Sequence, residues 1–113
     1  GETERSTDDP VYKTRKKIAS NGAIFVTLPV DKRGFLKGTP EVSSVGIFET
    51  DDTGFMKRQI QIEITRAIDD LTKTERKDKQ NLIRAVQIAS NKVVRASLGA
   101  DKKPQYSVHF VQK

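Results

Sequence analysis

The residues that could perform acid–base, nucleophilic or metal chemistry are few in this chain. His109 is the single histidine among 113 residues, and there is no cysteine. A zinc site takes three or four ligands, mainly histidine and cysteine, and a nucleophilic serine needs a base beside it. The carboxylates of Asp69 and Asp70 are adjacent in a helical segment, so their side chains diverge by about 100°. The sequence therefore predicts no catalytic site, metal site or bound cofactor in this chain, and it places His109 on the solvent side of a strand.

Known phosphate-binding and RNA-binding motifs are also absent. The run Gly34–Gly38 has the wrong spacing for a phosphate-binding loop, and it precedes a strand where such a loop would precede a helix. No G-x-x-G run lies between helices, as a KH domain requires, and the strand aromatics do not match those of an RRM.

Basic residues remain as binding candidates, and a polyanion such as RNA is the partner that they indicate. The net charge is +6. Lysine and arginine side chains neutralise phosphates and release counterions, although solvated surface charge would explain the same residues. The candidate RNA contacts form three clusters: Lys13, Arg15, Lys16 and Lys17; Arg76, Lys77 and Lys79; and Lys102 and Lys103.

The elements that must position these residues begin after a polar segment. Residues 1–17 are expected to form a flexible basic arm or linker, and residues 18–113 a single domain. Residues 23–30 alternate apolar side chains with a period of two, which predicts a strand, and Pro29 belongs near a strand end or at an edge. Residues 31–40 predict a hairpin loop, and residues 40–49 a second strand in which Gly46 marks a bulge or a close backbone approach.

Two helices and a last strand follow. Asp51, Asp52 and Thr53 suit a helix N-terminus, and the apolar stripe from Met56 to Leu71 predicts an amphipathic helix. After a charged junction over residues 73–79, a second helix runs to about residue 98, with Gly99 placed to end it. A final strand starts at Pro104. The predicted fold is an α+β two-layer sandwich of order β-β-α-α-β, a three-stranded sheet with both helices packed on one face.

Three apolar residues fall outside the core-facing stripes of the two helices. Phe55 and Ile62 are seven residues apart and share the outer face of the first helix, and Ile88 lies on the polar side of the second. If the helices pack side by side, these residues form a candidate self-association or interdomain surface. The alternative is that Phe55 folds back at the helix start and the others are scattered surface residues.

The order of these features resembles the C-terminal domain of ribonuclease J. The resemblance is carried by I-A-S-N-G-A-I-F-V-T-L-P-V-D at residues 18–31 and G-F-L-K-G-T-P-E-V-S-S-V-G-I-F at residues 34–48. Two helices and a strand led by Pro104 follow, so it covers about residues 13–113. The family often has Arg before the Gly of the second strand, where this chain has Val45, and any role of that arginine does not carry over.

The resemblance implies a parent enzyme with a metallo-β-lactamase and β-CASP core that binds zinc and cleaves RNA both as a 5′-exonuclease and as an endonuclease. The 113 residues would be an appended domain of that enzyme, joined to the catalytic core within one longer polypeptide chain. The domain would support homo-oligomer formation and full activity, and RNA contact would be a further role. A free-standing RNA-binding module is the alternative, and an autonomous enzyme is the third. A cytoplasmic location is expected, and no stretch approaches the roughly 20 apolar residues of a membrane span.

Overall fold

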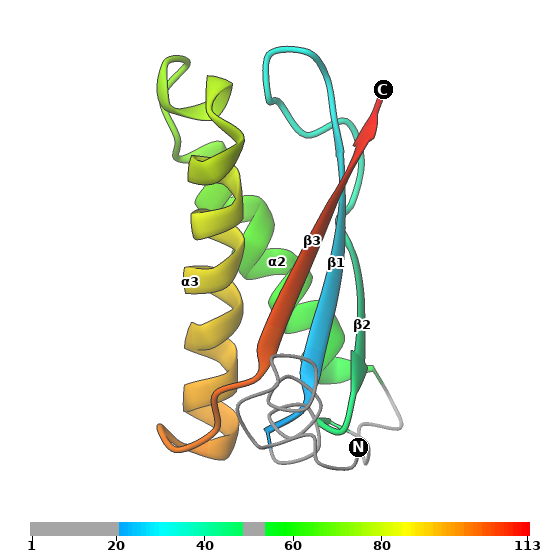
Figure 1. Ribbon diagram of the computed structural model, residues 1–113, viewed down its shortest axis with the longest axis vertical. Coiled ribbons are helices and arrows are strands. Elements are labelled where there is room, and N and C mark those ends of the chain that lie inside the picture. The colour runs from blue at the N-terminus through cyan, green and yellow to red at the C-terminus, as the bar shows by residue number, and fades with distance from the viewer. Residues whose placement is uncertain (1–20, 49–53) are drawn as a thin grey trace, which may run out of the picture.

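The computed structural model describes residues 21–48 and 54–113, which form one layer of strands and one layer of helices (Figure 1). The order of strands and α-helices confirms the predicted β-β-α-α-β arrangement. A short 3-10 helix, which the sequence analysis did not predict, interrupts the junction between the two long helices. The elements are β1 (Ala23–Val30), β2 (Glu41–Val45), α2 (Phe55–Asp69), η1 (Glu75–Lys77), α3 (Lys79–Leu98) and β3 (Gln105–Gln112).

The sheet is mixed and has β1 at its centre, in the order β2-β1-β3. β2 pairs with β1 in the antiparallel sense, as the hairpin predicts, and β3 pairs with β1 in the parallel sense. Pro29 lies near the end of this central strand, beyond Thr27, where the pairing with β2 stops. The Pro29 carbonyl accepts a hydrogen bond from the Lys37 N–H at 2.7 Å, so the backbone nitrogen and oxygen of Pro29 face the loop. The N–H that proline lacks is therefore not needed for pairing with a neighbouring strand.

The core lies between the sheet and the two helices. The alternate residues of β1, from Ile24 to Val30, are buried on the helical side, while Phe25 is exposed on the opposite face. Each fully buried aliphatic side chain contributes about 1.5–3 kcal/mol to the stability of the fold. The positions of the apolar stripes therefore decide which face of each helix packs against the sheet. Contacts of Met56 with Ser97 and of Glu63 with Lys92 show that α2 and α3 are antiparallel. The core residues from the helices include Ile60, Ile64, Ile68, Leu82, Val86, Ala89, Val93 and Val94.

β2 is shorter than predicted. It ends at Val45, because Gly46 has φ 72° and Phe48 has φ 59°, and neither value continues a strand. The prediction of a strand over residues 40–49 was therefore too long. α2 is preceded by Gly54 in the left-handed region, without a side-chain cap. The predicted cap residues Asp51, Asp52 and Thr53 and the arm over residues 1–17 lie outside the described residues.

Candidate nucleic-acid interface

A small basic cavity lies at the end of the sheet where β1 and β3 finish. Its volume is about 150 Å³. It brings Lys77 and Lys79, two of the predicted RNA contacts, together with Lys32, which the sequence analysis did not select. All three side chains are exposed. The lining is completed by Val30, Asp31, Gly34, Arg76, Leu82, Phe110 and Gln112.

Arg76 does not lie on the surface with its neighbours. Its position in the sequence beside Lys77 and Lys79 predicts a surface cation, but Arg76 is only 4% exposed, so this prediction was wrong. The guanidinium donates to three backbone carbonyls: those of Ile68 at 3.0 Å, Leu71 at 2.7 Å and Gly34 at 3.2 Å. The bonds to Ile68 and Leu71 satisfy carbonyls at the end of α2, where the helix dipole favours a cation.

The same guanidinium holds the loop between β1 and β2. Its carbon lies 4.1 Å from the centroid of the Phe35 ring, which places a cation against an aromatic face. Gly34 has φ 87°, and a Cβ on Gly34 would overlap the carbonyl oxygen of Arg76. The loop and the junction before α3 are therefore in direct backbone contact, and this contact builds the wall of the cavity.

The other predicted basic clusters do not join this cavity. Lys102 and Lys103 lie in the turn after α3, at the opposite end of that helix (Figure 1). A helix of 20 residues is about 30 Å long, so these lysines are remote from Lys77 and Lys79. Lys13, Arg15, Lys16 and Lys17 lie outside the described residues.

His109 is exposed, as predicted. It pairs in register with Thr27 and so lies on the sheet face opposite the helices. Among residues 21–48 and 54–113, no group of three or more His, Asp or Glu side chains could hold a metal ion.

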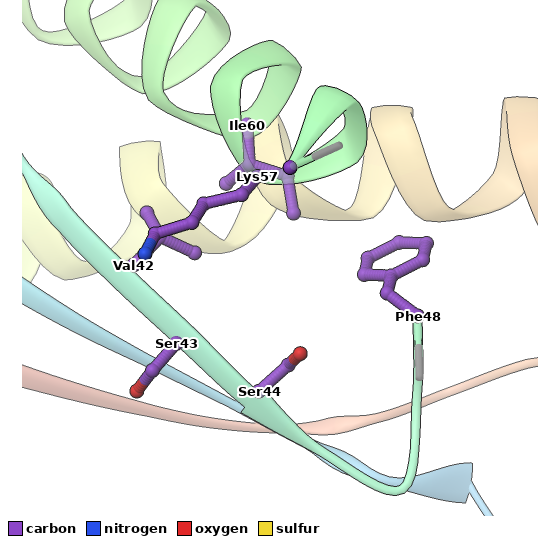
Figure 2. A pocket seen from close by; sticks show the side chains of 7 residues that line it. Val42, Ser43, Ser44, Phe48, Lys57 and Ile60 are labelled. Carbon is purple, nitrogen blue, oxygen red and sulfur yellow. The ribbon is translucent and has the colours of Figure 1, made fainter. Parts of the chain in front are cut away.

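A second cavity, of about 250 Å³, lies between β2 and α2 (Figure 2). Ser44 and Phe48 point into it, whereas Ser43 points away. The Ser44 hydroxyl donates to the Ile47 carbonyl at 3.0 Å, and none of the lining residues that the structure describes is a histidine or a carboxylate that could act as a base. The residues that line it do not form a nucleophilic site of the serine–base type.

The predicted self-association residues are exposed. The exposed fraction is 52% for Phe55, 49% for Ile62 and 64% for Ile88, so Phe55 does not fold back into the core. Glu63 pairs with Lys92 of α3 at 3.4 Å and with Arg66 at 3.3 Å. Arg66 and Lys92 are the i+4 neighbours of Ile62 and Ile88, so a charged cluster borders the two isoleucines.

Comparison with known families assigns the chain. The model of the ribonuclease J C-terminal domain family matches residues 10–111. This chain belongs to that family. A comparison with curated proteins found no match. The resemblance stated from residues 18–31 and 34–48 is thereby confirmed, and the match begins within a few residues of the expected start.

Two features of this ribonuclease J C-terminal domain follow from the structure. Val45 is the last residue of β2 and is 54% exposed, so the position projects into solvent and a longer side chain would fit there. In the part of the chain that the structure describes, no helix is both long and apolar enough to cross a membrane.

Proposed function

We propose that this ribonuclease J C-terminal domain is a non-catalytic part of a larger RNA-degrading and RNA-processing enzyme, in which it supports dimerisation and full activity. The cleavage of RNA would be carried out by the catalytic core of the parent polypeptide, with its zinc ions. The parent enzyme would act in the cytoplasm. The observation that carries the proposal is the set of exposed apolar side chains on the outer helical face, Phe55, Ile62 and Ile88, in a domain whose core is complete without them.

The size of this apolar surface sets what it can contribute. Full burial of a large apolar side chain contributes about 1.5–3 kcal/mol, so burying the exposed half of each contributes about 1 kcal/mol. A two-fold interface uses each residue twice, which amounts to about 6 kcal/mol. Association costs at least about 4 kcal/mol in lost freedom, so this surface alone supports a weak dimer. The parent enzyme would add further contacts.

Analytical ultracentrifugation of the parent enzyme tests the proposal, because the net of about 2 kcal/mol from this surface alone corresponds to a Kd of roughly 30 mM. Ile62→Asp and Ile88→Asp should each shift the dimer to monomer, because burying an unpaired carboxylate costs more than the surface contributes. Val111→Asp, at an exposed residue of the opposite sheet face, is the matched control and should leave the dimer intact. A parent enzyme that stays monomeric at hundreds of micromolar, or a dimer that only Val111→Asp dissociates, would contradict the proposal.

RNA contact is the second candidate function, because Lys77 and Lys79 line one cavity with Lys32. Among residues 21–48 and 54–113, no ion pair joins these three lysines to a carboxylate. Binding should weaken steeply with salt. A monomer whose RNA binding is weakened by charge reversal at Lys13, Lys16 and Lys17 would favour a free-standing RNA-binding module instead. Nuclease activity of the purified chain after chelation of contaminating metal would overturn the non-catalytic assignment.

A further inference from the structure

We propose that the basic cavity at the end of β1 and β3 binds one phosphate group, supplied by the backbone of an RNA strand. This inference rests on the second candidate function, RNA contact, and goes beyond it by assigning a site and a ligand group. Three lysines line the cavity from three segments: Lys32 from the loop after β1, Lys77 from η1 and Lys79 from the first residue of α3.

The carboxylates near the cavity do not cancel this charge. Asp31 lines it, but its side chain already accepts the N–H groups of Arg33 and Phe35 and pairs with Arg33 and Lys37. Asp78 caps α3 and accepts the N–H of Gln80 at 2.9 Å. An incoming anion would therefore meet Lys32, Lys77 and Lys79 as its available cations.

Arg76 supplies a second, independent reason to expect an anion. It lines the same cavity with a side chain that is 96% buried, and its Nε–H has no hydrogen-bond partner among the described residues. Its remaining partners are neutral carbonyls, and no carboxylate in the described part of the chain pairs with it. A buried cation without a counterion is costly, and an anion bound beside it would lower that cost.

The size of the cavity selects the ligand group. Pockets for drug-sized molecules measure about 300–1,000 Å³. A cavity of about 150 Å³ accommodates a phosphate group but not a whole nucleotide. The base would then lie outside, so the site should read the backbone without a base preference.

Backbone-amide NMR titrations of the chain with inorganic phosphate and with a short oligouridylate test the site. The amide signals of Lys32, Gly34, Lys77 and Lys79 should shift with both probes, and those of Lys102 and Lys103 should not. If phosphate shifts the cavity signals and the oligonucleotide does not bind, the phosphate site stands and RNA contact fails. If the oligonucleotide binds and the cavity signals stay unmoved, RNA contact stands and the cavity assignment fails. No shift with either probe overturns both.

A matched pair of double variants gives the quantitative arm. Lys77→Ala with Lys79→Ala should weaken oligouridylate binding, and Lys102→Ala with Lys103→Ala should not. The cavity neutralises one phosphate, so losing that contact flattens the slope of log affinity against log salt by about 0.7, and the loss of affinity between 50 and 200 mM salt should become about 2.6-fold smaller. Thermal unfolding followed by circular dichroism shows that each variant is folded. Equal slopes for the two double variants would overturn the site.

Discussion

Replacing Arg76 with Met tests whether the buried guanidinium holds the hairpin loop against the end of α2. The substitution removes three hydrogen bonds to carbonyls and the contact with Phe35. At about 1.5 kcal/mol for each bond to a charged donor and about 1 kcal/mol for the aromatic contact, the loss is about 5.5 kcal/mol. Methionine need not be desolvated as an ion, which offsets about 2.5 kcal/mol. We expect the free energy of unfolding to fall by about 3 kcal/mol.

Urea unfolding followed by circular dichroism measures this loss. A fall of about 3 kcal/mol corresponds to a decrease in Tm of roughly 10–20 °C for a domain of this size. Arg76→Lys keeps the charge but cannot reach three carbonyls with one ammonium group, so it should be at least as destabilised. The neighbouring exposed residue supplies the control, since Lys77→Met should change stability by less than about 0.5 kcal/mol.

A double-mutant cycle separates the aromatic contact from the hydrogen bonds. Phe35→Leu and Arg76→Met should show a coupling free energy of about 1 kcal/mol, because either substitution alone removes the same contact. Two results would refute the reasoning: a stability of Arg76→Met within about 1 kcal/mol of the unaltered chain, or a coupling energy indistinguishable from zero. A loss of stability within about 1 kcal/mol would mean that water hydrogen-bonds the three backbone carbonyls once the Arg76 side chain is removed.

Three further perturbations probe the same scaffold. In urea unfolding, Gly34→Ala should lower the free energy of unfolding by at least about 2 kcal/mol, because the residue has φ 87° and the new Cβ would overlap the Arg76 carbonyl. Gly99→Ala should lower it by about 1 kcal/mol, because Gly99 has φ 91° but open space around it. Burial raises the pKa of Tyr106 from 10.0 to about 12. The contribution of Tyr106 to stability is therefore fully present below about pH 10 and is lost as the pH rises through about 12. The difference in ultraviolet absorbance between the unaltered chain and Tyr106→Phe measures this titration. The pKa of Asp31 is lowered from 3.8, chiefly by the hydrogen bond from the Phe35 N–H. Its contribution to stability is therefore present above pH 3.8 and is lost as the pH falls through the lowered value. Asp31→Asn should make the free energy of unfolding in urea less sensitive to acid.

The sheet and helices could be predicted because burial leaves a period in the sequence. The alternation from Ile24 to Val30 and the stripe of Ile60, Ile64 and Ile68 each match the buried face that the structure shows. The same reasoning overextended β2, since apolar alternation carries no information about φ. The sequence predicts that Gly46 marks a bulge or a close backbone approach. The structure shows that Gly46 ends the strand in the left-handed region and that its backbone lies close to Gly22, where a Cβ would be 3.0 Å from the Gly46 carbonyl carbon.

The burial of Arg76 could not be predicted from its neighbours. In the run KTERKDK it looks like any solvated cation, and its contacts Gly34 and Phe35 lie about forty residues away. One local signal was available. Thr72 and Glu75 form a reciprocal capping box, in which the Glu75 N–H donates to the Thr72 hydroxyl and the Thr72 N–H to the Glu75 carboxylate. The pattern T-x-x-E predicts a helical turn, and hence η1, but not the direction of the next side chain.

The composition of the basic cavity follows from the topology more than from the clustering of lysines along the chain. β1 and β3 are parallel, so both end at the same edge of the sheet, and Lys32 just after β1 must lie near the end of β3. A connection of only six residues joins the end of α3 to the start of β3, so α3 must begin at that same edge. Lys79 is its first residue and Lys77 ends η1. In this fold Lys32 therefore lies near Lys77 and Lys79, and Lys102 and Lys103, in the short connection, lie at the opposite end of α3.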